Sequence, residues 1–287
     1  MTTAPHQTTA KPHPSTLITV APTGAETRKD AFPALPTTID ELVETAVRCE
    51  AAGAAMIHLH IRDADHNPTL ELSRLAEAVQ AVRESTTLVI QLSTGGSVHD
   101  PLDQRLKVLD AAPDSCSLTM GTTNFGDDMF LNPWPFVSEL YQLSQDRGVV
   151  PEFELFDLGQ VAALHRLLDG YGLPFGGRVH CDFVMGVPGG MPGTTDALVA
   201  GVQGLPAAVT SWSATGIGRT SLAVAYAALS KGGHLRVGME DTLTLARGVA
   251  VSHNEELVAR AAQLAELAQR PAMNTDEARD FLQVKAR

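Results

Sequence analysis

Cysteine is scarce in this 287-residue chain, because only Cys49, Cys116 and Cys181 occur and no two of them form a CxxC pair. Their number and spacing argue against both a disulfide framework and a zinc ribbon. Long apolar runs are also lacking, since none reaches the roughly 18 residues that a membrane-spanning helix requires. The first fifteen residues have neither a basic start nor an apolar stretch, so they do not form a secretory signal. We expect a cytoplasmic protein with a flexible tail, residues 1–15.

Positive charge is in deficit as well. The chain has 21 Lys and Arg residues against 33 Asp and Glu residues, which gives a formal net charge of −12. This balance disfavours nucleic acids and anionic membrane surfaces as partners. It does not exclude a small anionic substrate, because a few local arginines can outweigh the overall charge.

Eight short apolar or β-branched segments recur along the chain and predict strands. Amphipathic helical patterns lie between most of them, for example over 38–51 and over 72–83, where Leu75, Ala78, Val79 and Val82 share one face. After the last segment, Ser252 with Glu255 predicts a capping box and a helix that extends to about residue 269. The eight segments are 16–21, 55–61, 87–93, 115–120, 149–156, 178–185, 208–214 and 234–240.

This alternation of strands and helices predicts parallel pairing and an α/β fold. Eight such units in fewer than 290 residues match the size of a single (β/α)8 TIM barrel, here over residues 16–287. A doubly wound sheet is the competing interpretation. It is disfavoured because no GxGxxG follows the first strand and because candidate chemistry lies at nearly every strand end. No internal repeat or linker divides the chain, so one domain is expected.

Two histidines, His58 and His60, fall within the second predicted strand. Alternate residues of a strand point to the same face, so the two imidazoles share one side while Ile57, Leu59 and Ile61 pack on the other. Imidazoles at this spacing can chelate a divalent ion. The alternative is a pair of hydrogen-bonded polar residues inside the barrel.

The eighth predicted strand supplies a third candidate ligand, because Arg236, Gly238 and Glu240 share one parity and Glu240 stands at the carboxyl end. Barrel enzymes place their chemistry at that end. Strand eight is one strand away from strand two in a closed barrel, so Glu240 can reach the same ion. Two histidines and one carboxylate leave a coordination position open, which is typical of catalytic sites. Zinc is preferred, although iron, manganese or cobalt would accept the same ligands.

Further polar residues precede the ends of the middle strands. Glycine-rich turns at 186–190 and 216–219 expose backbone N–H groups, but such turns alone are weak evidence for a phosphate-bearing ligand. His180 and His234 lie near strand starts, so we interpret them as structural residues at the opposite end of the barrel. The polar pairs of matching parity are Gln91 with Ser93, Ser117 with Thr119, and Glu152 with Glu154.

The chain carries, in order, the motifs TGAET, IHLHIR, QLSTGG, GTTNFGDD, PEFELFD, FVMGVPGGM, GIGR and HLRVGMEDT. Together they resemble the β-keto acid cleavage enzymes, most closely the 3-keto-5-aminohexanoate cleavage type of lysine fermentation, over residues 17–270. The resemblance implies a TIM barrel, zinc on His58, His60 and Glu240, a homotetramer and a role in amino-acid catabolism. It also implies acetyl-CoA as co-substrate, which with a β-keto acid gives acetoacetate and a new acyl-CoA.

Such a reaction needs a base to remove the proton α to the keto group and a cation to hold the enolate oxygen. Asp241 adjoins a metal ligand and is our candidate base, with Arg236 orienting it or holding the substrate carboxylate. By resemblance, Ser93, Ser117 and Glu154 line the substrate pocket, and Glu154 is also a candidate for proton transfer. The family pattern has Thr where Ser117 stands and Asn where Thr119 stands, so these positions bear on substrate choice.

Glu26 follows the first predicted strand in the TGAET motif. By resemblance, it meets the amino group of an aminated keto acid. A carboxylate there predicts a preference for cationic substrates, such as 3-keto-5-aminohexanoate or dehydrocarnitine, over dicarboxylates such as 3-oxoadipate. The alternative is an exposed loop glutamate.

Two other functional classes are open. Amidohydrolase-type metal-dependent hydrolases also use HxH on a TIM barrel, but there the motif lies on the first strand and further histidine ligands come from middle strands. A non-enzymatic binding barrel is the third interpretation. Dependence on acetyl-CoA separates the cleavage enzyme from both.

Overall fold

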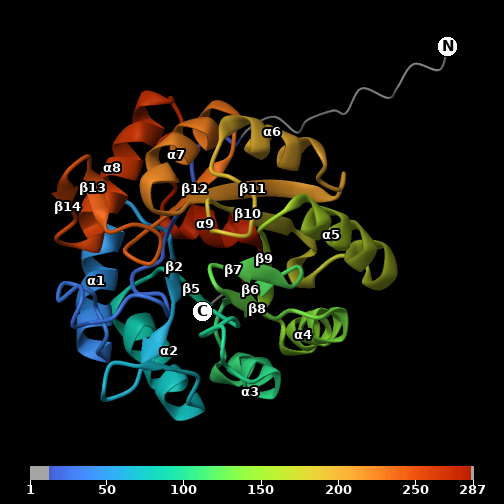
Figure 1. Ribbon diagram of the computed structural model, residues 1–287, viewed down its shortest axis with the longest axis horizontal. Helices are drawn as coiled ribbons and strands as arrows, with labels where there is room; N and C mark the ends of the chain where they lie inside the picture. Colours follow the sequence, from blue (N-terminus) through green and yellow to red (C-terminus); the bar gives the residue numbers. More distant parts are fainter. Residues whose placement is uncertain (1–12, 286–287) are drawn as a thin grey trace.

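The computed structural model describes residues 13–285, in which eight parallel strands close into a barrel surrounded by helices (Figure 1). The expected TIM barrel is confirmed, and each predicted strand segment overlaps one barrel strand. The barrel closes where β1 pairs with both β12 and β2. In order around the barrel, the strands are β1 (Ile18–Val20), β2 (Met56–Leu59), β5 (Val89–Leu92), β6 (Ser115–Thr119), β9 (Val150–Leu155), β10 (Val179–Met185), β11 (Val209–Gly216) and β12 (His234–Val237).

Helices cover the outside of the barrel. A capping box formed by Thr38 and Glu41 starts the first of them, and all four apolar residues predicted for the second are buried. None of the helices within residues 13–285 is both long and apolar enough to cross a bilayer. They are α1 (Ile39–Ala51), α2 (Leu72–Ser85), α3 (Leu102–Lys107), α4 (Trp134–Arg147), α5 (Leu158–Tyr171), α6 (Thr195–Gln203), α7 (Ser221–Ser230), α8 (Asn254–Leu267) and α9 (Thr275–Leu282).

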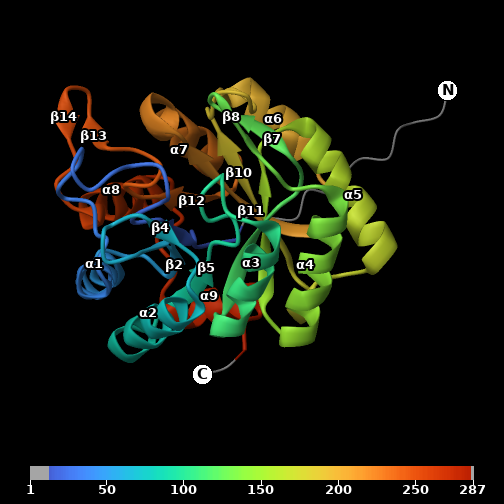
Figure 2. The same ribbon diagram turned by 60° about the horizontal axis from the view of Figure 1, so that its bottom comes forward.

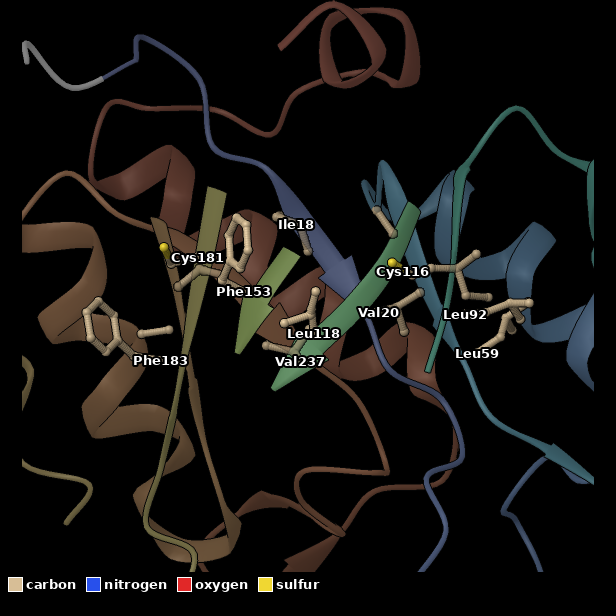
Figure 3. Packing of buried hydrophobic residues seen from close by; sticks show 14 of the residues in the cluster. Ile18, Val20, Leu59, Leu92, Cys116, Leu118, Phe153, Cys181, Phe183 and Val237 are labelled. Carbon is tan, nitrogen blue, oxygen red and sulfur yellow. The ribbon is translucent and has the colours of Figure 1, made fainter. Parts of the chain in front are cut away.

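The barrel strands have two buried faces of different character. Outward-facing apolar residues pack beneath the helices in the main hydrophobic core, and Figure 3 shows part of it, including Ile18 of β1, Phe153 of β9 and Phe183 of β10. Residues of the opposite parity are also buried, and most of them are polar, with Met56, Val89, Val150 and Val184 as apolar exceptions. The interior of this barrel is therefore a polar network on which the site is built. Its members include Thr19, His58, Gln91, Ser115, Ser117, Glu152, Glu154, His180, Asp182, Ser213, Thr215, His234 and Arg236.

The two ends of the barrel differ. Short hairpins extend the carboxyl ends of the strands, whereas α9 closes the opposite end (Figure 2). The ring of Phe281 on α9 packs against His180 and His234, with centroid distances of 6.2 and 4.9 Å. These histidines thus lie away from the strand ends that form the site, as expected. The hairpins are β3 (Ile61–Arg62) with β4 (Pro68–Thr69), β7 (Thr123–Phe125) with β8 (Asp128–Phe130), and β13 (Thr244–Ala246) with β14 (Val249–Ala250).

Two expected boundaries are wrong. Strand β12 ends at Val237 instead of 240. The next residue, Gly238, has φ +156° and approaches the Ala21 carbonyl oxygen so closely that a Cβ would lie 1.9 Å from it, so only glycine fits where the chain turns. The chain leaves the sheet there, and Glu240 lies in the following turn. Helix α8 begins at Asn254, and the carboxylate that bonds the preceding backbone N–H groups belongs to Glu256.

The expected tail, residues 1–15, falls largely outside the described residues. Within the described part, the carbonyl oxygen of His13 accepts a hydrogen bond from Arg270 Nε at 3.0 Å. Three residues later, Thr16 forms a bridge to Ala272. Residues from 13 onward are therefore attached to the barrel.

Candidate active site

A cavity of about 380 Å³ opens at the carboxyl ends of the barrel strands. Eight of the nine predicted site residues line it. They come from five strands or the segments that directly follow them, so the barrel closure brings together residues up to 215 positions apart (26 to 241). The eight are Glu26, His58, His60, Ser93, Glu154, Arg236, Glu240 and Asp241.

The three expected metal ligands converge. His58 lies in β2 and His60 directly follows it, and their Nε2 atoms are 3.8 and 3.6 Å from Glu240 Oε1. Each of the three residues offers one potential ligand atom, and these three atoms all lie within 4.8 Å of one another. Glu240 reaches them from the turn that follows β12 instead of from the strand itself.

Three observations show that this group of side chains fits a divalent cation. Glu240 Oε2 is buried and finds no hydrogen-bond partner among the described residues. Burial, with a further contribution from Arg236, lowers the pKa of His58 to about 4, so its imidazole is neutral at neutral pH, the form that binds metals. Finally, Glu240 shares the single guanidinium of Arg236 with Glu154 and Asp241, and a cation between Glu240 and the two histidines would offset the charge of its carboxylate.

The wall behind Glu240 is formed by the loop after β1. Gly24 has φ +62°, and a Cβ at this position would lie 2.6 Å from Glu240 Cγ. Arg62, the last residue of the IHLHIR motif, donates through Nη2 to the carbonyl oxygens of Gly24 (2.7 Å) and Thr27 (2.9 Å). Arg62 therefore holds the loop that places Glu26, an exposed residue, in the cavity wall.

Arg236 organises the carboxylates of the site. It donates to Asp241 through Nη2 (3.1 Å) and Nε (3.3 Å), to Glu154 through Nη1 (3.0 Å), and also contacts Glu240. Burial raises the pKa of Asp241 to about 8, with Arg236 opposing the shift. A carboxyl group with such a pKa can exchange a proton near neutral pH, which is what a general base requires.

Glu154 is the second proton-exchanging candidate. Its Oε2 accepts a hydrogen bond from Thr119 Oγ1 at 2.8 Å, and its Oε1 accepts the bond from Arg236. Burial raises the pKa of Glu154, while Arg236 and Thr119 oppose the shift. Thr119 thus positions Glu154.

The two predicted serines have different surroundings. Ser93 lines the cavity, and its Oγ accepts a hydrogen bond from the Gly95 N–H at 3.2 Å. Ser117 is buried and is not among the described residues that line the cavity. Its carbonyl oxygen accepts a hydrogen bond from Thr94 Oγ1 at 2.7 Å, so it supports the loop beside Ser93. The structure brings Ser93, but not Ser117, to the cavity surface.

One part of the cavity was not predicted. Phe125, Phe130 and Phe156 form a cluster of edge-to-face rings, with centroids 6.1 to 6.3 Å apart, and Val184 and Val187 continue this apolar wall. Phe125 and Phe130 come from the β7–β8 hairpin, which is an addition to the barrel pattern. Phe125 within the GTTNFGDD motif and Phe130 shortly after it were the signal that the sequence offered for this wall, but their spacing did not indicate that they line the cavity.

The glycine-rich turn at 186–190 has a packing role. Gly189 has φ +106°, and a Cβ on it would lie 2.5 Å from the Asn124 carbonyl oxygen. Val187 and Pro188 of the same turn line the cavity. The turn therefore packs closely against β7 and forms part of the apolar wall.

A closed barrel whose strand ends gather two imidazoles, four carboxyl groups and one guanidinium around a cavity defines the class of protein: a TIM-barrel enzyme with a candidate metal centre. The chain belongs to the β-keto acid cleavage enzyme family, whose family model matches residues 15–284. This membership supports the cleavage-enzyme interpretation over the hydrolase and the non-enzymatic barrel.

Similar proteins are consistent with this assignment. The chain is 36% identical to a 3-keto-5-aminohexanoate cleavage enzyme of Fusobacterium nucleatum, over 94% of this chain and 98% of the relative. It is 34% identical to a 3-oxoadipate:acetyl-CoA acetyltransferase of Cupriavidus necator, over 93% and 94%. A solved ternary complex of ObcA with a C4-CoA adduct and oxalate matches with a TM-score of 0.79 and 21% identity, over 88% of this chain and 68% of that one. This last likeness shows the shared fold alone.

Proposed function

We propose that this enzyme transfers acyl groups between a β-keto acid and acetyl-CoA. The bond between the substrate's acyl carbon and its CH2–COO− unit breaks, and that unit forms a new bond to the acetyl group, giving acetoacetate. The substrate's acyl group takes over the thioester bond to CoA. The observation that carries the proposal is the Arg236–Asp241 pair, which lines one cavity together with His58, His60 and Glu240. The name of the Cupriavidus relative also includes acetyl-CoA.

His58, His60 and Glu240 would hold one divalent ion, for which zinc is our preference. When bound, such an ion supplies Lewis-acid polarisation of the substrate's keto oxygen. Asp241 accepts the proton from the carbon between the keto and carboxylate groups. Arg236 keeps the Asp241 carboxylate in a fixed orientation, and Glu154 exchanges a proton on the opposite side of the guanidinium.

The charges of the cavity favour a cationic substrate. Among the described residues that line it, Arg236 is the sole Lys or Arg, and its hydrogen bonds to Glu154, Glu240 and Asp241 use four of its five N–H groups. A second substrate carboxylate would find no further Lys or Arg there, and Glu26 would repel it. The two relatives are almost equally similar to this chain, although their names specify an aminated and a dicarboxylic substrate. The cavity, not the degree of identity, therefore supports the choice.

Two further parts of the proposal rest on the resemblance, a homotetramer and a role in amino-acid catabolism, and a cytoplasmic location is proposed as well. The first has a direct measurement. Light scattering coupled to size-exclusion chromatography should give four times the 30.4 kDa chain mass. A monomer in solution would contradict it without affecting the chemistry.

The decisive experiment for the activity is an assay of the purified protein with a panel of aminated, neutral and dicarboxylic β-keto acids. Acetoacetate should form only when acetyl-CoA is present, and a new acyl-CoA should appear in equal amount. Cleavage that proceeds without acetyl-CoA would indicate a hydrolase, and no turnover of any panel member would contradict the proposal.

A further inference from the structure

A line of buried side chains runs through the barrel interior from a candidate metal ligand towards the closed end. His58 Nδ1 lies 2.5 Å from Gln91 Oε1, and Gln91 Nε2 lies 3.2 Å from Glu152 Oε1. Glu152 Oε2 lies 3.3 Å from His180 Nε2, and His180 Nδ1 lies 2.7 Å from Ser211 Oγ. Gln91, Glu152 and His180 are at most 3% exposed, and none of them lines the cavity.

The hydrogen-bond chemistry of these groups fixes a direction. An ionised carboxylate only accepts hydrogen bonds, so the Gln91 amide must present its NH2 group to Glu152. Ser115 Oγ, at 3.2 Å from the same nitrogen, accepts its second hydrogen. The carbonyl oxygen of Gln91 therefore faces His58, and Nδ1 of that imidazole must carry the hydrogen.

This tautomer is the one that a metal site at His58 requires. With the hydrogen on Nδ1, the lone pair of Nε2 points towards Glu240, 3.8 Å away. The opposite tautomer would place an N–H group at the metal position. Glu152, whose carboxylate lies two hydrogen bonds away from His58, thus decides which nitrogen of that imidazole is unprotonated and able to bind a metal.

Glu152 stays ionised despite its complete burial. Burial raises the pKa of this carboxyl group, but the contact of its Oε2 with His180 Nε2 at 3.3 Å and the charges of the neighbouring side chains outweigh the effect, so the net shift is downward. Glu152 does not line the cavity, and its hydrogen bond to the site is the one from Gln91. In many metal proteins a carboxylate contacts the ligand histidine directly, whereas here an amide stands between them.

We propose that Gln91 and Glu152 are positioning residues that set the His58 tautomer and thereby the metal affinity of the site. This inference rests on the metal site of the proposed function. Residues that orient histidine ligands typically change metal affinity by about 10- to 100-fold when they are removed. We expect an effect of that size from the loss of the Glu152 charge alone.

The test compares four forms of the full-length protein: the wild type, Glu152→Gln, the double exchange Gln91→Glu with Glu152→Gln, and Ser115→Ala. Zinc affinity is measured on metal-stripped protein by competition with a chromophoric chelator. Glu152→Gln should bind zinc about 10- to 100-fold more weakly, because the amide at 91 is then free to turn. The double exchange keeps shape and composition and moves the carboxylate next to His58, so it should recover most of that loss. Ser115→Ala removes the other acceptor of Gln91 but keeps the charge, and should bind within about threefold of the wild type.

Direct detection of the tautomer needs no variant of the proposed residues. The side-chain ¹⁵N shifts of His58 in the metal-free wild type should show a protonated Nδ1 and an unprotonated Nε2, with the signals assigned by their loss in His58→Gln. A protonated Nε2 would overturn the inference. So would a double exchange that binds zinc as weakly as Glu152→Gln, or a Glu152→Gln protein with wild-type affinity. A wild type that binds no divalent metal would instead remove the metal site of the proposed function, and this inference with it.

Discussion

Arg236 donates two hydrogen bonds to Asp241, from Nη2 at 3.1 Å and from Nε at 3.3 Å, although Asp241 does not lie on the same strand. The chain leaves β12 at Gly238 and turns, so that the Asp241 N–H bonds the Gly238 carbonyl oxygen at 3.0 Å. This turn brings Asp241, the candidate base, next to Arg236 of β12. It also sets Glu240 against the two histidines.

Asp241→Asn keeps the size of this side chain and removes its basicity. Turnover should fall by at least roughly a hundredfold, the lower end for general-base catalysis. Elemental analysis should find the metal content unchanged, because Asp241 is not one of the three converging ligands. If metal is lost together with activity, Asp241 mainly supports Glu240.

Replacing either candidate histidine ligand tests the metal centre. We expect His58→Ala and His60→Ala to abolish activity and to leave the protein short of metal, since two ligands hold a divalent ion poorly. The wild type should contain about one divalent ion per chain. A His60→Ala protein with full activity would contradict the assignment of this ligand set.

Gly24→Ala tests the close approach of the first loop to Glu240. The added Cβ would lie 2.6 Å from Glu240 Cγ, so the carboxylate must move and both metal content and activity should fall. Gly248→Ala is the matched control, because Gly248 has a similar φ of +77° but nothing within 4 Å of the new Cβ. Equal effects of the two substitutions would mean that backbone strain, not contact with Glu240, is responsible.

His234 should make stability depend on pH. Burial, with contributions from His180, Arg270 and His13, lowers the pKa of His234 well below its usual value, and its neutral Nδ1 accepts the Leu17 N–H at 2.9 Å. In the unfolded chain this group takes up a proton near pH 6.5. Its contribution to stability is therefore complete above about pH 6.5 and is lost as the pH falls below that value.

The comparison for this prediction is His234→Asn, which keeps an acceptor near the position of Nδ1 but does not titrate. Chemical denaturation of both proteins between pH 7 and pH 5 should give a shallower loss of unfolding free energy for the variant. The difference in slope should approach about 1.4 kcal/mol per pH unit, the value for one proton. Other buried histidines, such as His58, contribute equally to both proteins. Parallel curves would show that His234 does not take part.

The sequence predicted the barrel because strand periodicity is local, and it predicted His58 and His60 because alternate residues share a face. It misplaced Glu240 on the strand. The chain leaves β12 at Gly238, which packs against the backbone of Ala21, and this contact joins residues more than 200 positions apart. The apolar wall was missed because Phe125 and Phe156 meet only in the folded structure. For the same reason, the pairing of Gln91 with Glu152 does not follow from strand parity: parity predicts that each faces inward, but not which partner it meets.

The last prediction concerns substrate choice and Glu26. This carboxylate lines the cavity on the loop that Arg62 holds, and the described residues of the cavity wall offer no uncommitted Lys or Arg opposite it. The wild type should therefore prefer aminated β-keto acids, such as 3-keto-5-aminohexanoate or dehydrocarnitine, over 3-oxoadipate. Glu26→Gln should weaken selection for the cationic substrate by roughly 1–3 kcal/mol, the scale of a hydrogen bond to a charged group, and should change neutral substrates little.

The measurement is kcat/KM for aminated, neutral and dicarboxylic substrates in the wild type, in Glu26→Gln and in a control, Asp30→Asn. Asp30 is an exposed carboxylate near Glu26 in the sequence that pairs with Arg28 and does not line the cavity, so its loss should leave all three values unchanged. A change confined to the aminated substrate in Glu26→Gln would establish the charge contact, because a general disturbance of the loop would act on every substrate. Equal losses on aminated and neutral substrates would give Glu26 a structural role, and a wild-type preference for dicarboxylates would overturn the cationic assignment.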